Sequence, residues 1–99
     1  MAWATNHIAS LASGETVKFR PHGNSMSGKI ESGQLVTVEP VTDLETLKVD
    51  DIVLCKVNGY QYLHIIDSIA DGRFMIKNNK GHQNGWTKAI YGRLISVED

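Results

Sequence analysis

Apolar and polar residues alternate along most of the chain after residue 14, and a period of two is typical of β-strands. The alternation begins over residues 16–20 and ends at Pro21. We predict further strands over residues 35–39, 51–57, 60–69, 73–77 and 89–97. Asn58-Gly59 and Asp71-Gly72 are tight-turn pairs that join neighbouring strands as antiparallel hairpins. Gly92 is predicted to mark a bulge or bend in the last strand.

The segments between the strands have other patterns. Residues 1–14 carry Trp3, Ile8 and Leu11 at helical spacing, which predicts a short N-terminal helix or arm. We expect loops over residues 22–34 and 78–85, which are rich in Gly, Ser and Asn, and a polar connection with a short helical turn over 43–49. The fold class is therefore mainly β, with a single small antiparallel β-rich domain over residues 15–99.

Composition narrows the class of protein. The 99 residues suffice for one domain, and 41% hydrophobic with 21% charged residues is ordinary for a globular chain. A net charge of −1 with scattered Lys and Arg argues against direct nucleic-acid binding. The single cysteine, Cys55, lies in an apolar run and is expected to be a small core residue rather than a nucleophile. The sequence carries neither a membrane-spanning stretch nor a secretory signal, so we expect a cytoplasmic protein with no membrane contact.

The loop His22-Gly23-Asn24-Ser25-Met26 is the first segment that suggests chemistry. A glycine beside a small hydroxyl residue permits a tight turn that exposes the hydroxyl, as an attacking serine requires. Met26 is apolar and is expected to anchor the turn against the core. Taken alone, however, a serine in a Gly-rich loop is far more often a turn residue than a nucleophile.

A second candidate, His64, lies in the middle of a predicted strand. Alternation places His64 on the same face as Tyr62 and Ile66, with Leu63 and Ile65 on the other face. A lone histidine on such a strand is more often a packed, hydrogen-bonded residue than a catalytic one. The polar loop that begins at Asn78 is able to reach back across the sheet towards it.

Four segments in one order resemble the LexA/signal-peptidase superfamily of serine peptidases. They are GNSMSGKIESGQLVTVEPV, LKVDDIVLCKVNGYQYLHII, GRFMIKNNKGHQNGW and IYGRLISV. The resemblance covers residues 15–97 and implies that Ser25 is the nucleophile, with His64 at the position of the general base. LexA-type and bacterial enzymes place lysine there, whereas endoplasmic-reticulum-type and archaeal signal peptidases place histidine. The ordinary pKa of a histidine side chain is near 6.5, so histidine acts as a base at neutral pH without a large change in its pKa.

A catalytic histidine also needs a partner that fixes its tautomer, and that partner is usually a carboxylate. Histidine-type members of the family have an Asp in the loop after their Asn pair, but this chain has no acid over residues 80–84. The candidates for orienting His64 or lining the site are Asn79, His82, Asn84, Asp50 or Asp51, Met26 and Asn24. The sequence does not decide among them.

The resemblance thus implies a peptidase that hydrolyses a peptide bond with a Ser25–His64 dyad. The alternative is a catalytically silent binding module of the same fold, such as a phage or prophage accessory protein that binds a peptide or protein partner or forms a homodimer. The missing acid and the absence of an upstream helix-turn-helix domain favour this alternative. A metal site formed by His22, His64 and His82 matches no known ligand spacing, so we expect no metal or cofactor.

Overall fold

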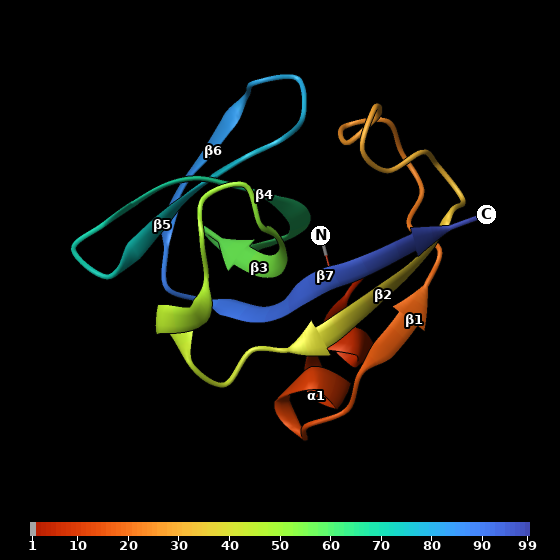
Figure 1. The fold of residues 1–99 in the computed structure, drawn as a ribbon, viewed down its shortest axis with the longest axis horizontal. Helices are drawn as coiled ribbons and strands as arrows, with labels where there is room; N and C mark the ends of the chain where they lie inside the picture. Colours follow the sequence, from red (N-terminus) through yellow and green to blue (C-terminus); the bar gives the residue numbers. More distant parts are fainter. Residues whose placement is uncertain (1) are drawn as a thin grey trace.

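The computed structural model describes residues 2–99, which form a mainly β domain, as the alternation predicts (Figure 1). In chain order the elements are α1 (Thr5–Ala12), β1 (Val17–Phe19), β2 (Leu35–Pro40), η1, a 3₁₀ turn (Leu44–Thr46), β3 (Ile52–Val57), β4 (Tyr60–Ala70), β5 (Arg73–Lys77), β6 (Gln83–Thr87) and β7 (Ile90–Glu98). No helix among residues 2–99 is long and apolar enough to cross a membrane.

The strands form one antiparallel sheet in the order β1-β2-β7-β3-β4-β5-β6. Strands β3 to β6 are a meander of consecutive hairpins. The turn between β3 and β4 is Asn58-Gly59, and both residues have the positive φ that a tight hairpin turn requires, 51° and 84°. Strand β7, the last in sequence, lies between β2 and β3 and so joins the meander to the β1–β2 pair.

The prediction of a loop over residues 78–85 is wrong at its C-terminal end. Residues 83–87 form β6, which pairs with β5. Asn84 and Gly85 have low strand propensity, so the local sequence gives no signal for this strand. Tertiary contacts hold it instead: the Thr87 hydroxyl donates a 2.6 Å hydrogen bond to the Lys56 carbonyl, and Gly85 packs closely on Val57.

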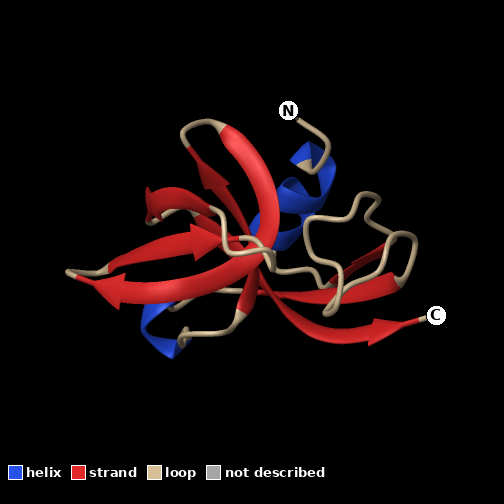
Figure 2. Cartoon of the chain, turned by 90° about the horizontal axis from the view of Figure 1, so that it is seen from above, coloured by secondary structure: helices blue, strands red, loops and turns tan. Residues whose placement is uncertain are grey.

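Two hydrophobic clusters lie on opposite faces of the sheet. The first lies beneath α1 and contains Leu11, Met26, Leu54, Leu63 and Ile65 among its buried residues. The second faces the η1 turn and includes Val53, Cys55, Ile66, Phe74 and Ile76. Figure 2 shows α1 and the short η1 helix on the two sides of the strands. The alternation predicted for β4 is therefore observed.

Cys55 is fully buried in the second cluster, and burial raises the pKa of its thiol to about 12. A thiol with so high a pKa carries almost no thiolate at neutral pH, and the thiolate is the nucleophilic form. The interpretation of Cys55 as a core residue is confirmed.

Strand β7 carries the bulge that Gly92 predicts. Leu54 pairs with Gly92 and Cys55 with Ile90, so Tyr91 is the extra residue beside the glycine. Gly92 itself has a second role, because a Cβ built there would lie 2.5 Å from Val38 Cγ1 and 2.8 Å from Leu11 Cδ1. The absence of a side chain at residue 92 thus lets β2 and α1 pack closely on β7.

Candidate active site

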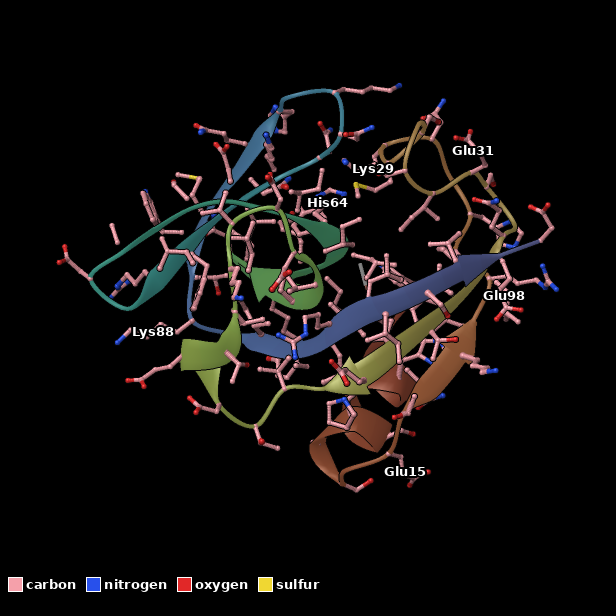
Figure 3. All side chains as sticks on the ribbon, in the orientation of Figure 1. Glu15, Lys29, Glu31, His64, Lys88 and Glu98 are labelled. Carbon is pink, nitrogen blue, oxygen red and sulfur yellow. The ribbon has the colours of Figure 1, made fainter. Side chains whose placement is uncertain are left out.

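Ser25 and His64 are 39 residues apart in sequence and adjacent in space. The distance from Ser25 Oγ to His64 Nε2 is 3.2 Å, within reach of a hydrogen bond. Ser25 lies on the loop between β1 and β2, and His64 lies on β4. In Figure 3 His64 lies on the sheet, while Lys29 and Glu31 lie on that loop across from it.

The conformation of the Ser25 loop follows from its sequence. Met26 and Ile30 are both buried in the first cluster, and the Ile30 N–H donates a 2.8 Å hydrogen bond to the Met26 carbonyl. Gly23 has a φ of 121°, which glycine adopts without strain, and its N–H donates to the Ser32 hydroxyl. The loop is thus anchored on both sides of Ser25, which stays half-buried.

Asn84 is the partner that orients His64. Its Oδ1 lies 2.7 Å from His64 Nδ1. An amide oxygen only accepts hydrogen bonds, so this contact places the imidazole proton on Nδ1 and leaves Nε2 free to accept from the Ser25 hydroxyl. That is the tautomer a general base requires.

The other residues considered as partners of His64 have different contacts. The Asn79 N–H donates to the Ser25 carbonyl at 2.9 Å, and its Nδ2 donates to the Ser27 carbonyl at 2.7 Å. Asn79 therefore holds the Ser25 loop rather than the imidazole. Neither Asp50 nor Asp51 has a hydrogen bond to His64 among the described contacts. The Asp51 carboxylate instead accepts from the Lys48 N–H at 2.9 Å.

Of the two residues proposed to line the site beside Ser25, only one does so. Met26 lines the cavity and anchors the loop in the core. Asn24 is exposed, is not among the residues around the cavity, and contributes its carbonyl to a turn with the Ser27 N–H.

His64 is almost fully buried, and its ring stacks on Tyr62 with centroids 4.7 Å apart. Burial lowers the pKa of His64 below its ordinary value of 6.5, the hydrogen bond to Asn84 raises it in part, and the positive charge of nearby His82 lowers it further. A depressed pKa keeps the imidazole neutral at pH 7, which is the protonation state in which it accepts a proton.

A cavity of about 520 Å³ opens beside the Ser25–His64 pair. Its wall includes His82 and Asn84 from the β5–β6 region and His22 from the Ser25 loop. No group of three or more His, Cys, Asp or Glu side chains among residues 2–99 is arranged to hold a metal ion. Most of the wall residues are not predicted by the sequence as part of a site, among them Trp3, Gln61 and Tyr62. Of these residues, Trp3 alone carries a signal in the sequence, because it is a large aromatic residue near the N-terminus.

One edge of β4 is unpaired where it meets the cavity. Residues 60–64 pair with β3, whereas the β4–β5 pairing begins at Ile65. Alternate residues of an antiparallel strand direct their N–H and C=O groups to opposite edges. The Gln61 carbonyl accepts from the Trp3 indole on this open edge, so the backbone groups of Leu63 point the same way. Gln61 and Leu63 both line the cavity.

Neither a scan against protein-family models nor a search of curated proteins finds a match to this chain. A function is therefore inferred from the geometry of the site. Ser25 contacts His64, His64 contacts Asn84, and this row of contacts lies beside a cavity with an open strand edge.

The Asn84 contact predicts a specific pH dependence. An Asn84→Asp variant places a carboxylate against Nδ1, which favours the imidazolium and raises the pKa of His64. The acid limb of the rate at which Ser25 reacts with a phosphonate should then move to higher pH than in the wild type, where burial lowers the pKa of His64 below 6.5. Above that limb the variant should react faster, because the carboxylate stabilises the imidazolium that forms in the transition state.

The measurement is the rate of phosphonate labelling of Ser25 between pH 4 and 9. Asn78→Asp is the matched control, because Asn78 lines the same cavity but contacts Lys80 and His82 rather than His64. We expect a smaller displacement of the limb in this control. Equal displacements in the two variants would show that a carboxylate anywhere near the cavity shifts the limb, and that the Asn84 contact with Nδ1 has no special effect.

Proposed function

We propose that the protein is a serine hydrolase that cleaves a peptide bond, with Ser25 as nucleophile, His64 as general base and Asn84 as the residue that positions His64. The observation that carries this proposal is the continuous contact from Ser25 Oγ to His64 Nε2 at 3.2 Å and from His64 Nδ1 to Asn84 Oδ1 at 2.7 Å. The order of these residues fits the resemblance to the LexA/signal-peptidase superfamily, with an amide where histidine-type members have a carboxylate.

The reaction follows from this arrangement in two halves. Ser25 Oγ attacks the carbonyl carbon while Nε2 of His64 takes the hydroxyl proton, and a tetrahedral intermediate forms. The imidazolium then gives the proton to the leaving amine, the C–N bond breaks, and the acyl group stays on Ser25. Water, activated by the same imidazole, repeats the sequence and releases the acid. Asn84 keeps the ring in position but carries no charge, so it stabilises the imidazolium less than a carboxylate does.

The backbone around Ser25 supplies donors for the oxyanion. Among residues 2–99 no hydrogen bond engages the N–H of Ser25 or that of Met26. Both groups belong to the turn that presents the nucleophile, the position from which backbone N–H groups stabilise a developing oxyanion. This supports acyl transfer as the reaction class.

The open edge of β4 supports a peptide as the substrate. The free backbone groups at Leu63 offer a donor and an acceptor to an extended chain, which would add to the sheet beside His64. A small ester has no peptide backbone groups that would pair with this edge. A cytoplasmic setting and a phage-type origin stay predictions from the sequence.

Active-site labelling tests the proposal. The wild type is incubated with a tripeptidyl diphenyl phosphonate, and intact-mass spectrometry should show one adduct on Ser25. The Ser25→Ala variant should show none. Ser27→Ala is the matched control, because it removes a hydroxyl two residues away in the same loop, and it should label like the wild type. Labelling that persists in the Ser25→Ala variant would refute the assignment.

The second candidate function is the catalytically silent binding module. The neutral Asn84 favours it, because a carboxylate at this position is what most strongly supports a histidine base. The same labelling experiment separates the two functions, since a silent module would leave the wild type unmodified by every phosphonate while its cavity still bound peptide.

A further inference from the structure

Trp3 is fixed at the wall of the cavity by the residues around it. Its indole N–H donates a 3.0 Å hydrogen bond to the Gln61 carbonyl, and the Gln61 side chain accepts from the Ala4 N–H at 2.6 Å. The Gln61 Nε2 donates in turn to the Thr5 hydroxyl at 3.1 Å. Gln61 and Ala4 are both buried. The start of α1 is therefore attached to the open edge of β4, two residues from Leu63.

The aromatic ring of Trp3 also packs against other aromatic side chains. Phe19 contacts it in a tilted arrangement with ring centroids 5.7 Å apart, and His7 stacks on Phe19 at 4.2 Å. Even so, 43% of Trp3 is exposed. Because Trp3 also lines the cavity, part of this exposed aromatic surface is presented to whatever occupies the cavity.

Part of the cavity wall is apolar, beside the polar residues of the Ser25 loop and of the β5–β6 region. Pro21, Met26, Ile30 and Leu63 line the cavity together with Trp3. Glu31 is the sole carboxylate on the wall, and its Oε2 is engaged by the Gly28 N–H at 2.7 Å. A volume of about 520 Å³ far exceeds what a methyl side chain needs. Such a cavity favours a large, uncharged apolar group.

We propose that Trp3 is a specificity-determining residue, which forms one wall of a pocket for a large apolar side chain, of the size of leucine or phenylalanine, on the acyl side of the scissile bond. The inference rests on the proposed function, because it takes Ser25 as the nucleophile. The acyl part of the substrate stays bonded to Ser25, which lines the same cavity. The Trp3 indole also binds the Gln61 carbonyl, so an added peptide strand pairs with the backbone of Leu63 instead. A side chain of that peptide then enters the space beside the indole.

The first test compares two tripeptidyl diphenyl phosphonates that differ only in the residue next to phosphorus, leucine or alanine. The wild type should react with the leucine reagent at least about tenfold faster, as expected for burial of the extra methylene and methyl groups. Trp3→Ala should lose most of this preference, and Trp3→Phe, which keeps a ring but not the N–H, should keep part of it. Trp86→Ala is the matched control: Trp86 is 44% exposed on β6 and lies outside the cavity wall, so the preference should be unchanged.

Equal rates for the two reagents in the wild type, or an unchanged preference in Trp3→Ala, would overturn the inference while leaving the proposed function in place. A wild type that reacts with neither reagent would instead overturn the proposed function. In that case a peptide-binding measurement tests the pocket. The same binding measurement is used if circular dichroism shows that Trp3→Ala is unfolded.

That second measurement uses a Ser25→Ala, Trp86→Phe variant, in which Trp3 is the remaining tryptophan. Trp3 fluorescence is titrated with N-acetyl-Ala-Ala-Leu-amide and with N-acetyl-Ala-Ala-Ala-amide. We expect a change in emission and an affinity for the leucine peptide at least about tenfold higher. Equal affinities, or no change in emission with either peptide, would show that Trp3 does not form such a pocket.

Discussion

Ser25 of the His64→Ala variant is expected to react with a diphenyl phosphonate between about 10² and 10⁴ times more slowly than Ser25 of the wild type. A serine hydroxyl is a weak nucleophile at neutral pH, and His64 Nε2, 3.2 Å away, is the group placed to take its proton. The measurement is the second-order rate of phosphonate labelling at pH 8. Added imidazole should restore part of the rate, since the deleted ring leaves space beside an open cavity.

His82→Ala is the matched control for this variant. His82 lines the same cavity, has no hydrogen bond to Ser25 among residues 2–99, and lowers the pKa of His64 through its positive charge. We expect labelling at pH 8 to be preserved in His82→Ala, with the acid limb of the profile moved to higher pH. A His64→Ala variant that labels at the wild-type rate would exclude His64 as the base and leave Ser25 without an activating group.

Gly92→Ala is expected to produce a large loss of stability for so small a change, about 1–3 kcal/mol, as found for overpacked cores. The added Cβ would lie 2.5 Å from Val38 Cγ1, closer than atoms approach in real side-chain contacts, and 3.0 Å from the Glu39 carbonyl oxygen. In a domain of this size such a loss lowers the Tm by at least about 4 °C. Thermal unfolding followed by circular dichroism measures it.

A double variant distinguishes this clash from other effects of the substitution. Val38→Ala removes the methyl group that the new Cβ meets, so Gly92→Ala and Val38→Ala should couple. We expect the double variant to be more stable than the sum of the two single losses predicts, by at least about 0.5 kcal/mol. Strict additivity would show that the destabilisation does not arise from contact with Val38.

Most of the fold could be predicted from the sequence because most of its strands carry their own signal. β4 alternates between two buried faces, and its turn with β3 contains Asn58-Gly59, whose residues adopt the positive φ of a tight hairpin. β6 carries no such signal. Its residues Asn84 and Gly85 are typical of loops, and the strand exists because β5 and Lys56 supply its hydrogen bonds.

The candidate site shows the same division. The adjacency of Ser25 and His64 is implied by the order of the four family-like segments, whereas the loop chemistry of Ser25 and the strand position of His64 do not single out either residue alone. Their partners could not be separated by sequence, since Asn79 and Asn84 lie five residues apart in one polar segment. The pairing of β5 with β6 decides between them: it brings Asn84 to the imidazole and leaves Asn79 at the Ser25 loop. Trp3 joined the site only through contacts across 58 residues of sequence.

The position of β7 has a consequence for how the protein is made. Ser25 lies on the loop joining β1 to β2, whereas His64 and Asn84 belong to the β3–β6 meander, and β7 is the strand that pairs with both β2 and β3. During synthesis the meander is able to form from neighbouring hairpins, which close quickly because their contacts are local. The link to the Ser25 loop forms only after β7, which follows the meander in the chain, has been synthesised. A nascent chain is therefore expected to keep His64 and Ser25 apart until β7 has paired with both β2 and β3.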